Sequence, residues 1–199
     1  MATILILGVI FVIALIFFGA GVGMYNALVT LRNETKSAFA QIDVQLQRRY
    51  DLIPNLVNVA KRYMKHERET LEAVIKARNA ACDASARVAS DPTDPSAMKS
   101  LVGAEGSLGS VLGRLFALSE SYPELKADTQ MSSMMKQLGE TENSVSYARQ
   151  AYNDAVLKYN TKREVFPSSI IAGIFNFKEA ELFEVESQEI RRAPKVDFD

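Results

Sequence analysis

The N-terminal segment of this chain has no charged side chain before Arg32. Within it, residues 4–22 consist almost entirely of Ile, Leu, Val, Phe, Ala and Gly. A run of that length spans the hydrocarbon core of a bilayer as one helix, which needs about 20 apolar residues. We therefore expect a transmembrane anchor in residues 1–24, followed by a body that is mostly polar.

A cleaved signal peptide is the main alternative to a retained anchor. Such peptides begin with basic residues, have an apolar stretch of roughly 7–15 residues and end at a small-residue cleavage site. Here no Lys or Arg precedes the apolar run, the run is longer, and no A-x-A pattern follows it. The sequence therefore favours an anchor that stays attached to the body.

The flanks of the anchor predict its orientation. Lys and Arg are enriched on the cytoplasmic side of a membrane helix. Only the terminal amine precedes the span, and four basic residues follow it: Arg32, Lys36, Arg48 and Arg49. We expect the body in the cytoplasm and a short N-terminus outside, although Glu34 and Asp43 reduce the charge bias.

Gly19 and Gly23 form a G-x-x-x-G pattern inside the anchor. This pattern lets two membrane helices approach closely, so the two glycines are candidates for packing between copies of the span. The alternative interpretation is that glycine is simply common in membrane helices.

The composition argues against several classes of function. The net charge of −1 does not indicate a nucleic-acid partner. Cys82 and His66 are each the only residue of their kind, so an internal disulfide is excluded and the usual metal and triad sites lack partners. Catalysis needs acids, bases or nucleophiles that converge in a pocket, and the sequence offers no convincing set. We expect no enzymatic activity, no cofactor and no small-molecule substrate.

The body, residues 25–177, has the periodicity of long amphipathic helices. Apolar residues recur at three- and four-residue steps through two segments before a break at residues 91–95. Asp94 and Pro95 then suit the N-cap and first position of a third helical segment, which ends near Tyr122. That segment contains glycine at positions 103, 106, 109 and 113. These glycines fit a helix against which a neighbour packs very closely; otherwise this helix is the loosest of the body.

The fourth helical segment is the most regular. Its apolar residues step by seven and predict a seam of coiled-coil type, formed by Leu138, Val145, Tyr152, Tyr159 and Phe166. The two tyrosines, each followed by Asn, would either line a groove for a ligand or pack in the core with their hydroxyls at the rim. Pro167 ends the segment, and we expect residues 178–199 to form a partly irregular, acidic tail.

Pro54 is the point at which the topology is open. The apolar phase continues through it, which suits one kinked helix. However, an unbroken helix from Tyr25 to Ser90 would run roughly 100 Å at 1.5 Å per residue, too long for the later segments to cover. A reversal near residues 50–54, with Asp51 as the next N-cap, would give four segments of comparable length. The sequence therefore favours an all-α fold: one transmembrane helix and an antiparallel four-helix bundle, with the reversal at Pro54.

Short motifs are spread along most of the chain. They are Tyr25-Asn26, residues 42–49 (IDVQLQRR), residues 51–57 (DLIPNLV), His66-Glu67, Ala77-Arg78, residues 152–156 (YNDAV), Tyr159-Asn160 and residues 175–184. Together they resemble the motifs of the LemA family, and the match is weakest in the Gly-rich third segment. The resemblance implies a membrane-anchored four-helix body without assigned enzymatic activity, often encoded near membrane metalloproteases and other envelope proteins.

A polar cluster interrupts the apolar stripe around Pro54. It comprises Asp43, Arg48, Arg49, Asp51 and Asn55. As a recognition patch, its arginines would bind carboxylate or phosphate groups of a partner. Alternatively, Asp51 caps the next helix while Asp43 and the arginines pair along one helix face.

We consider three functions for this chain. The first is a non-enzymatic scaffold or adaptor at the bilayer surface, which binds copies of itself or envelope proteins such as a membrane metalloprotease. The second is an oligomeric protein that shapes or organises the membrane. The third is a metal- or ligand-binding bundle, in which Asp43, Glu67 and Glu142 would meet between the helices.

Overall fold

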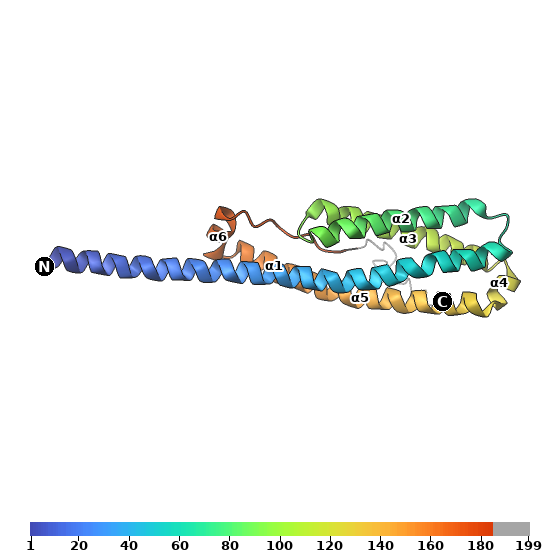
Figure 1. Ribbon diagram of the computed structural model, residues 1–199, viewed down its shortest axis with the longest axis horizontal. Coiled ribbons are helices and arrows are strands. Elements are labelled where there is room, and N and C mark those ends of the chain that lie inside the picture. The colour runs from blue at the N-terminus through green and yellow to red at the C-terminus, as the bar shows by residue number, and fades with distance from the viewer. Residues whose placement is uncertain (185–199) are drawn as a thin grey trace, which may run out of the picture.

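The computed structural model describes residues 1–184, which form helices joined by short connections and contain no strand (Figure 1). The helices are α1 (Ala2–Tyr63), α2 (Arg68–Ser90), α3 (Pro95–Ser119), α4 (Pro123–Ala127), α5 (Thr129–Glu164) and α6 (Ser168–Ile174). The fold class predicted from the sequence is therefore confirmed.

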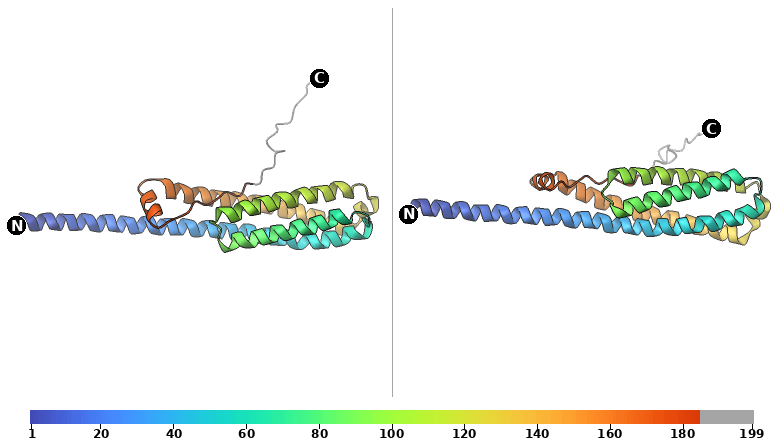
Figure 2. Two further views of the ribbon diagram at one scale, coloured as in Figure 1. Left: turned by 90° about the horizontal axis from the view of Figure 1, so that it is seen from above. Right: turned by 45° about the horizontal axis from the view of Figure 1, so that its top comes forward.

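The bundle is built on the half of α1 that lies away from the N-terminus. There α1 packs against α5 and α2, and α2 packs against α3, so that the long helices alternate in direction (Figures 1 and 2). We call the end formed by the α1–α2 connection and α4 the distal end, because it lies opposite the N-terminus. The bundle therefore extends away from the apolar end of α1.

The apolar part of α1 projects beyond the bundle. All side chains from residue 1 to residue 20 are exposed, so no described protein surface covers them. By length and composition α1 and α3 are both able to cross a membrane. However, α3 buries Met98, Leu101, Leu108, Leu112 and Leu115 inside the bundle. The exposed apolar part of α1 therefore indicates membrane association.

The core follows the apolar stripe read from the sequence. On α1, the buried residues are Leu28, Thr35, Phe39, Ile42, Leu46, Arg49, Tyr50, Ile53, Leu56, Val57, Val59 and Ala60. The partner stripe on α5 includes Tyr152, whose ring lies 5.9 Å from that of Phe39 in an edge-on arrangement. Helix-on-helix burial of this kind supplies most of the stability of a long amphipathic helix.

Two aspartates act as helix N-caps, Asp94 for α3 and Asp128 for α5. The Asp94 carboxylate accepts a hydrogen bond of 2.8 Å from the Ser96 amide, as the sequence predicts for an N-cap. Asp128 accepts bonds of 2.8 and 3.0 Å from the amides of Gln130 and Met131 and caps α5. Asp128 also accepts a bond from the Tyr63 hydroxyl at 2.9 Å, which ties the end of α1 to the start of α5. Backbone and tyrosine donors accordingly lower the pKa of Asp128.

The predicted reversal at Pro54 is wrong. Helix α1 continues through Pro54 to Tyr63, and the chain reverses only at residues 64–67. Asp51, expected to be a helix N-cap, lies inside α1 instead. The length argument failed because it assumed that all of α1 must be covered: the part of α1 nearer the N-terminus extends past the ends of α2 and α3 (Figure 1).

An arginine from α2 explains how α1 accommodates Pro54. Proline has no N–H, so the carbonyl of Tyr50 loses its partner four residues later in the helix. The Nε of Arg78 donates a hydrogen bond of 3.1 Å to that carbonyl. A second helix therefore satisfies the acceptor that proline leaves free in the first.

The third helix also differs from expectation. A Cβ added at any of its four glycines would meet nothing within 4 Å, and all four positions are exposed. Close packing at these glycines is therefore not the reason for their presence, and nothing in the structure explains them. The helix ends at Ser119, and the short α4 begins at Pro123.

We predict that Arg78 and Pro54 are energetically coupled. Arg78→Met should lower the free energy of unfolding by about 1.5–3 kcal/mol, the range for a hydrogen bond from a charged donor. In a Pro54→Ala background the loss should fall below about 1 kcal/mol, because the alanine amide then serves the Tyr50 carbonyl. Urea unfolding of the full chain in mild detergent, followed by circular dichroism, measures both values. Equal losses in the two backgrounds would contradict the coupling.

Candidate functional site

A buried polar cluster lies at the centre of the bundle. Arg49 of α1 places Nη1 3.0 Å from a carboxylate oxygen of Glu105 on α3. The Tyr50 hydroxyl donates a hydrogen bond of 2.6 Å to the other oxygen of Glu105. Glu142 of α5 lies 3.0 Å from the same Nη1, so three helices meet at one guanidinium group.

The electrostatics of the cluster follow from its burial. The side chains of Arg49 and Glu105 are only 10% and 4% exposed. Burial raises the pKa of Glu105, while the hydrogen bond from Tyr50 and the charge of Arg49 act in the opposite direction. Burial also raises the pKa of Tyr50, and the neighbouring Glu105 carboxylate adds to this, so the hydroxyl stays a neutral donor. The groups satisfy one another, which indicates a structural role.

Removal of Glu105 should therefore be costly. Glu105→Ala leaves Arg49 buried with only a partly exposed partner, and we expect a loss of about 3–5 kcal/mol in the free energy of unfolding. The matched control is Glu142→Ala, because the Glu142 side chain is 60% exposed; its loss should stay below about 1 kcal/mol. Urea unfolding in detergent measures both variants, and equal losses would show that the buried pair has no special weight.

The remaining residues of the predicted interaction patch lie apart from this cluster. Asp43 accepts a hydrogen bond of 2.7 Å from the Ser85 hydroxyl of α2. Arg48, Asp51 and Asn55 are exposed. The structure therefore does not bring the five residues together as one surface: Arg49 points into the bundle, and three of the others lie on its outside.

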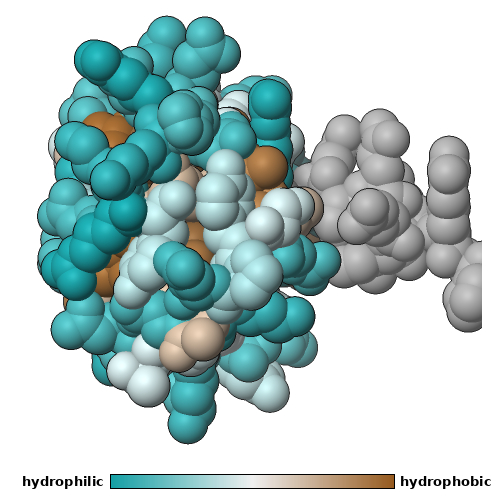
Figure 3. Space-filling model, turned by 90° about the vertical axis from the view of Figure 1, so that its right-hand side faces the viewer, coloured by the Kyte–Doolittle hydropathy of each residue, from teal (hydrophilic) through white to brown (hydrophobic). Residues whose placement is uncertain are grey.

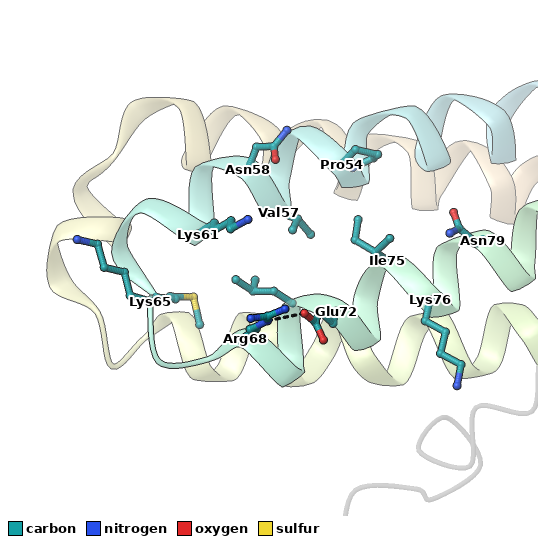
Figure 4. Close-up of a pocket in the computed structure, with 12 residues that line it drawn as sticks. Pro54, Val57, Asn58, Lys61, Lys65, Arg68, Glu72, Ile75, Lys76 and Asn79 are labelled. Atoms are coloured by element: carbon teal, nitrogen blue, oxygen red, sulfur yellow. Dashed lines mark hydrogen bonds and ion pairs between the residues drawn. The ribbon is translucent and has the colours of Figure 1, made fainter.

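A groove lies between α1 and α2 near the distal end and has a volume of about 800 Å³ (Figure 4). Its floor is apolar and is formed by Pro54, Val57, Met64, Leu71 and Ile75. Figure 4 shows Val57 and Ile75 reaching into the space from opposite helices. Such a shape suits the apolar face of a helix better than a small polar ligand.

The rim of the groove is mainly basic. Four cationic side chains line it, Lys61, Lys65, Arg68 and Lys76, together with the neutral Asn58 and Asn79. Among the residues that the structure describes, Glu72 is the acidic one on the rim, and it accepts a hydrogen bond of 2.6 Å from Arg68 (Figure 4). An apolar floor with a basic rim is complementary to an amphipathic helix that has acidic flanks.

The tyrosines and asparagines of α5 bind the chain's own C-terminal segment. The side-chain amide of Asn160 donates a hydrogen bond of 2.8 Å to the backbone carbonyl of Ala180. It also accepts one of 3.0 Å from the backbone N–H of Ala180. Asn153 makes the same pair of bonds with Phe183, at 3.4 and 2.9 Å. The Tyr159 hydroxyl donates to the carbonyl of Lys178 at 2.7 Å, and the Tyr152 hydroxyl donates to that of Glu181 at 3.0 Å. We call Tyr152, Asn153, Tyr159 and Asn160 the Tyr-Asn ladder.

The heptad spacing of the ladder matches an extended strand of chain. Seven residues of helix rise about 10.5 Å. Ala180 and Phe183 are three residues apart, and an extended chain spans at most about 3.3–3.6 Å per residue. Asn153 and Asn160 are one heptad apart and bind Phe183 and Ala180, so the chain between these two residues must be almost fully extended to cover the same distance. The possible ligand groove at the two tyrosines is wrong, because residues 178–183 occupy it.

In the structure, the predicted seam of α5 ends at Tyr159 and does not include Phe166. Leu138, Val145, Tyr152 and Tyr159 are buried. Phe166 lies beyond the end of α5 and is 80% exposed, so its inclusion in the seam is wrong. The helix stops at Glu164, before Pro167, and the heptad pattern has no structural meaning beyond it.

A comparison with family models places most of this chain in one family. The LemA family model matches residues 38–198. The chain belongs to the LemA family. This matched range contains most of the bundle, the ladder and the groove, and it begins after the apolar part of α1.

Three magnetosome proteins are similar to this LemA-family chain. Magnetosome proteins MamQ 1 and MamQ 2 of Paramagnetospirillum magneticum are each 29% identical over 192 residues, which cover 88% of this chain and 71% of theirs. Magnetosome protein MamQ of Magnetospirillum gryphiswaldense is 27% identical over 174 residues, covering 80% and 64%. These relatives are bacterial proteins, and the similarity extends over most of both chains.

The metal-site hypothesis does not survive in its predicted form. Asp43 binds Ser85, Glu142 binds Arg49, and Glu67 accepts a hydrogen bond of 3.1 Å from the Tyr122 hydroxyl. The three carboxylates therefore lie at different places in this LemA-family bundle. Within residues 1–184, no group of three His, Cys, Asp or Glu side chains is arranged to hold a metal ion.

Sequence reasoning missed the groove and the role of Glu105. Glu105 lies among the apolar residues of α3, and a lone acid at such a position was a signal for a buried partner. The basic rim was visible as a mixed-charge run, but solvated helix surfaces have the same appearance. Only the packing of α1 against α2 distinguishes the basic rim of a groove from an ordinary solvated helix surface.

Proposed function

We propose that this LemA-family chain is a non-enzymatic, membrane-anchored adaptor, and that the groove between α1 and α2 binds an acidic amphipathic helix of another envelope protein. The groove carries this proposal, because it combines an apolar floor with a basic rim. The central titratable groups support it as well. Arg49, Tyr50 and Glu105 satisfy one another in the interior and do not face an open pocket.

The continuous α1 places this groove far from the bilayer. From Val22, where the apolar run ends, to Tyr63 the helix rises about 60 Å. Its length is set by the uninterrupted path through Pro54. A partner would therefore meet the adaptor well beyond the lipid headgroups, through a segment that itself extends from the membrane.

The distal end itself is a poor candidate for the contact. Figure 3 looks onto this end and shows a mostly hydrophilic surface with small hydrophobic patches. The groove opens on the side of the bundle, where apolar residues from both helices line one continuous space. We therefore assign the docking surface to the side of the bundle.

We further propose that the body lies in the cytoplasm and the N-terminus outside. The basic residues after the apolar run support this orientation. A protease added to spheroplasts should leave the body intact and should digest it only after the membrane is permeabilised. Digestion of the body in intact spheroplasts would reverse the assignment.

Site-specific photo-crosslinking tests the adaptor function. A photoreactive amino acid at Asn58, on the rim of the groove, should form one discrete adduct in cells, and mass spectrometry should identify an acidic helix of a second envelope protein. Reversal of the rim charge with Lys61→Glu and Lys76→Glu should reduce the adduct at least about tenfold, the effect of losing roughly 1.4 kcal/mol.

The matched control moves the same charge change elsewhere. Lys126 and Lys158 are exposed and lie outside the groove. The substitutions Lys126→Glu and Lys158→Glu should therefore leave the amount of adduct unchanged. Circular dichroism confirms that each variant is folded. An adduct with a second copy of this chain would overturn the docking assignment in favour of self-association, and absence of any adduct would overturn the groove as a contact surface.

A further inference from the structure

The segment between α5 and the ladder-bound chain is apolar and exposed. Residues 165–177, which we call the α6 segment, contain no charged side chain. Its outward side chains include Phe166, Ile174, Phe175 and Ile170, which are 80%, 69%, 57% and 54% exposed. Water is a poor surrounding for four large apolar side chains on so short a stretch.

The α6 segment is nevertheless held in a defined position. Its inward residues Ser168 and Ala172 are buried, and α6 packs against both α1 and α5. After α6 the chain turns at Asn176, whose φ of 53° lies in the left-handed region. The amides of Phe177 and Asn176 bond to the carbonyls of Ala172 and Gly173, which closes the helix in a Schellman motif.

The contacts of this segment with α1 fix its level relative to the membrane span. A Cβ on Gly21 would lie 3.8 Å from the Cδ1 atom of Ile171. The ring of Tyr25 lies 4.7 Å from that of Phe175 and 5.7 Å from that of Phe177. Gly21 belongs to the last turn of the apolar run, which ends at Val22. Figure 1 shows α6 beside α1, beyond the ends of α2 and α3.

Polar groups flank the α6 segment on its bundle side. Arg163, at the end of α5, pairs with Glu164 and Glu179 at 3.0 and 2.9 Å. The guanidinium of Arg32 lies 5.3 Å from the ring of Phe177. An apolar surface bordered by charges and aromatic rings is typical of an element that lies at a membrane interface.

We propose that the α6 segment inserts its exposed face, Phe166, Ile170, Ile174 and Phe175, into the interfacial layer of the same bilayer that α1 spans. Its occupant is lipid, because the surface continues directly from the membrane-spanning part of α1. The body is then attached to the bilayer at two points, the span itself and the end of α5. This inference does not depend on the adaptor function.

Tryptophan fluorescence tests the insertion, because the chain has no tryptophan of its own. The full chain with Phe166→Trp, or separately Ile174→Trp, is reconstituted into phosphatidylcholine vesicles with or without brominated acyl chains. An inserted side chain lies about 5–10 Å below the headgroup boundary, so its emission should fall roughly twofold or more in brominated vesicles and resist aqueous iodide.

The control is Tyr147→Trp on α5, where the native side chain is 76% exposed. Tyr147 lies about 25 Å from Glu164 along α5, on the side away from the α6 segment. Emission from a tryptophan at this position should therefore be quenched by iodide and not by bromine. Circular dichroism verifies that each variant is folded. Strong iodide quenching at both 166 and 174 would overturn the proposal. Protection from iodide without bromine quenching would also overturn it, since protein would then cover the segment.

Discussion

Helix α1 belongs both to the membrane segment and to the bundle, and the rest of the architecture is arranged around that shared element. Because α1 is unbroken, the bundle extends away from the apolar part of that helix. One contact between helices accompanies this continuity: Pro54 leaves the carbonyl of Tyr50 without its usual donor, and Arg78 of α2 replaces it. The same contact joins α2 to α1, the two helices that line the groove.

The interior distributes polar groups in a consistent way. The Arg49–Glu105 pair joins α1 to α3, the Tyr-Asn ladder joins α5 to the C-terminal segment, and Asp128 joins α5 to the end of α1. In each case a buried or partly buried polar side chain links elements distant in sequence. We infer that these bonds help to specify the alignment of the long helices, which apolar packing alone defines less sharply.

Much of the fold was predictable from the sequence. The all-α class, the membrane-associated helix, the break at residues 91–95 and the cap at Asp94 follow from local patterns that have one main physical cause. Pro54 was misjudged because the donor that compensates for it is 24 residues away, on another helix. Phe166 was placed in the seam because periodicity does not reveal that the helix has ended.

The candidate sites were less predictable for the same reason. The two Tyr-Asn pairs were recognisable as a repeated feature of α5, but their partner is a segment of irregular chain whose position no periodicity encodes. The groove requires two helices to be aligned, and its floor is ordinary core sequence on either helix alone. Pairing between distant segments therefore limits what one sequence can show.

The uninterrupted length of α1 has a mechanical consequence. A stiff rod that protrudes about 60 Å converts a small rotation of its embedded part into a large displacement of its tip. Membrane helices tilt by about 20° on average and adjust their tilt to bilayer thickness, and such an angle corresponds to roughly 20 Å of sideways travel at the far end. With α1 as the only anchor, a change of tilt would move the groove by that distance, and the second attachment proposed at the α6 segment would oppose the movement.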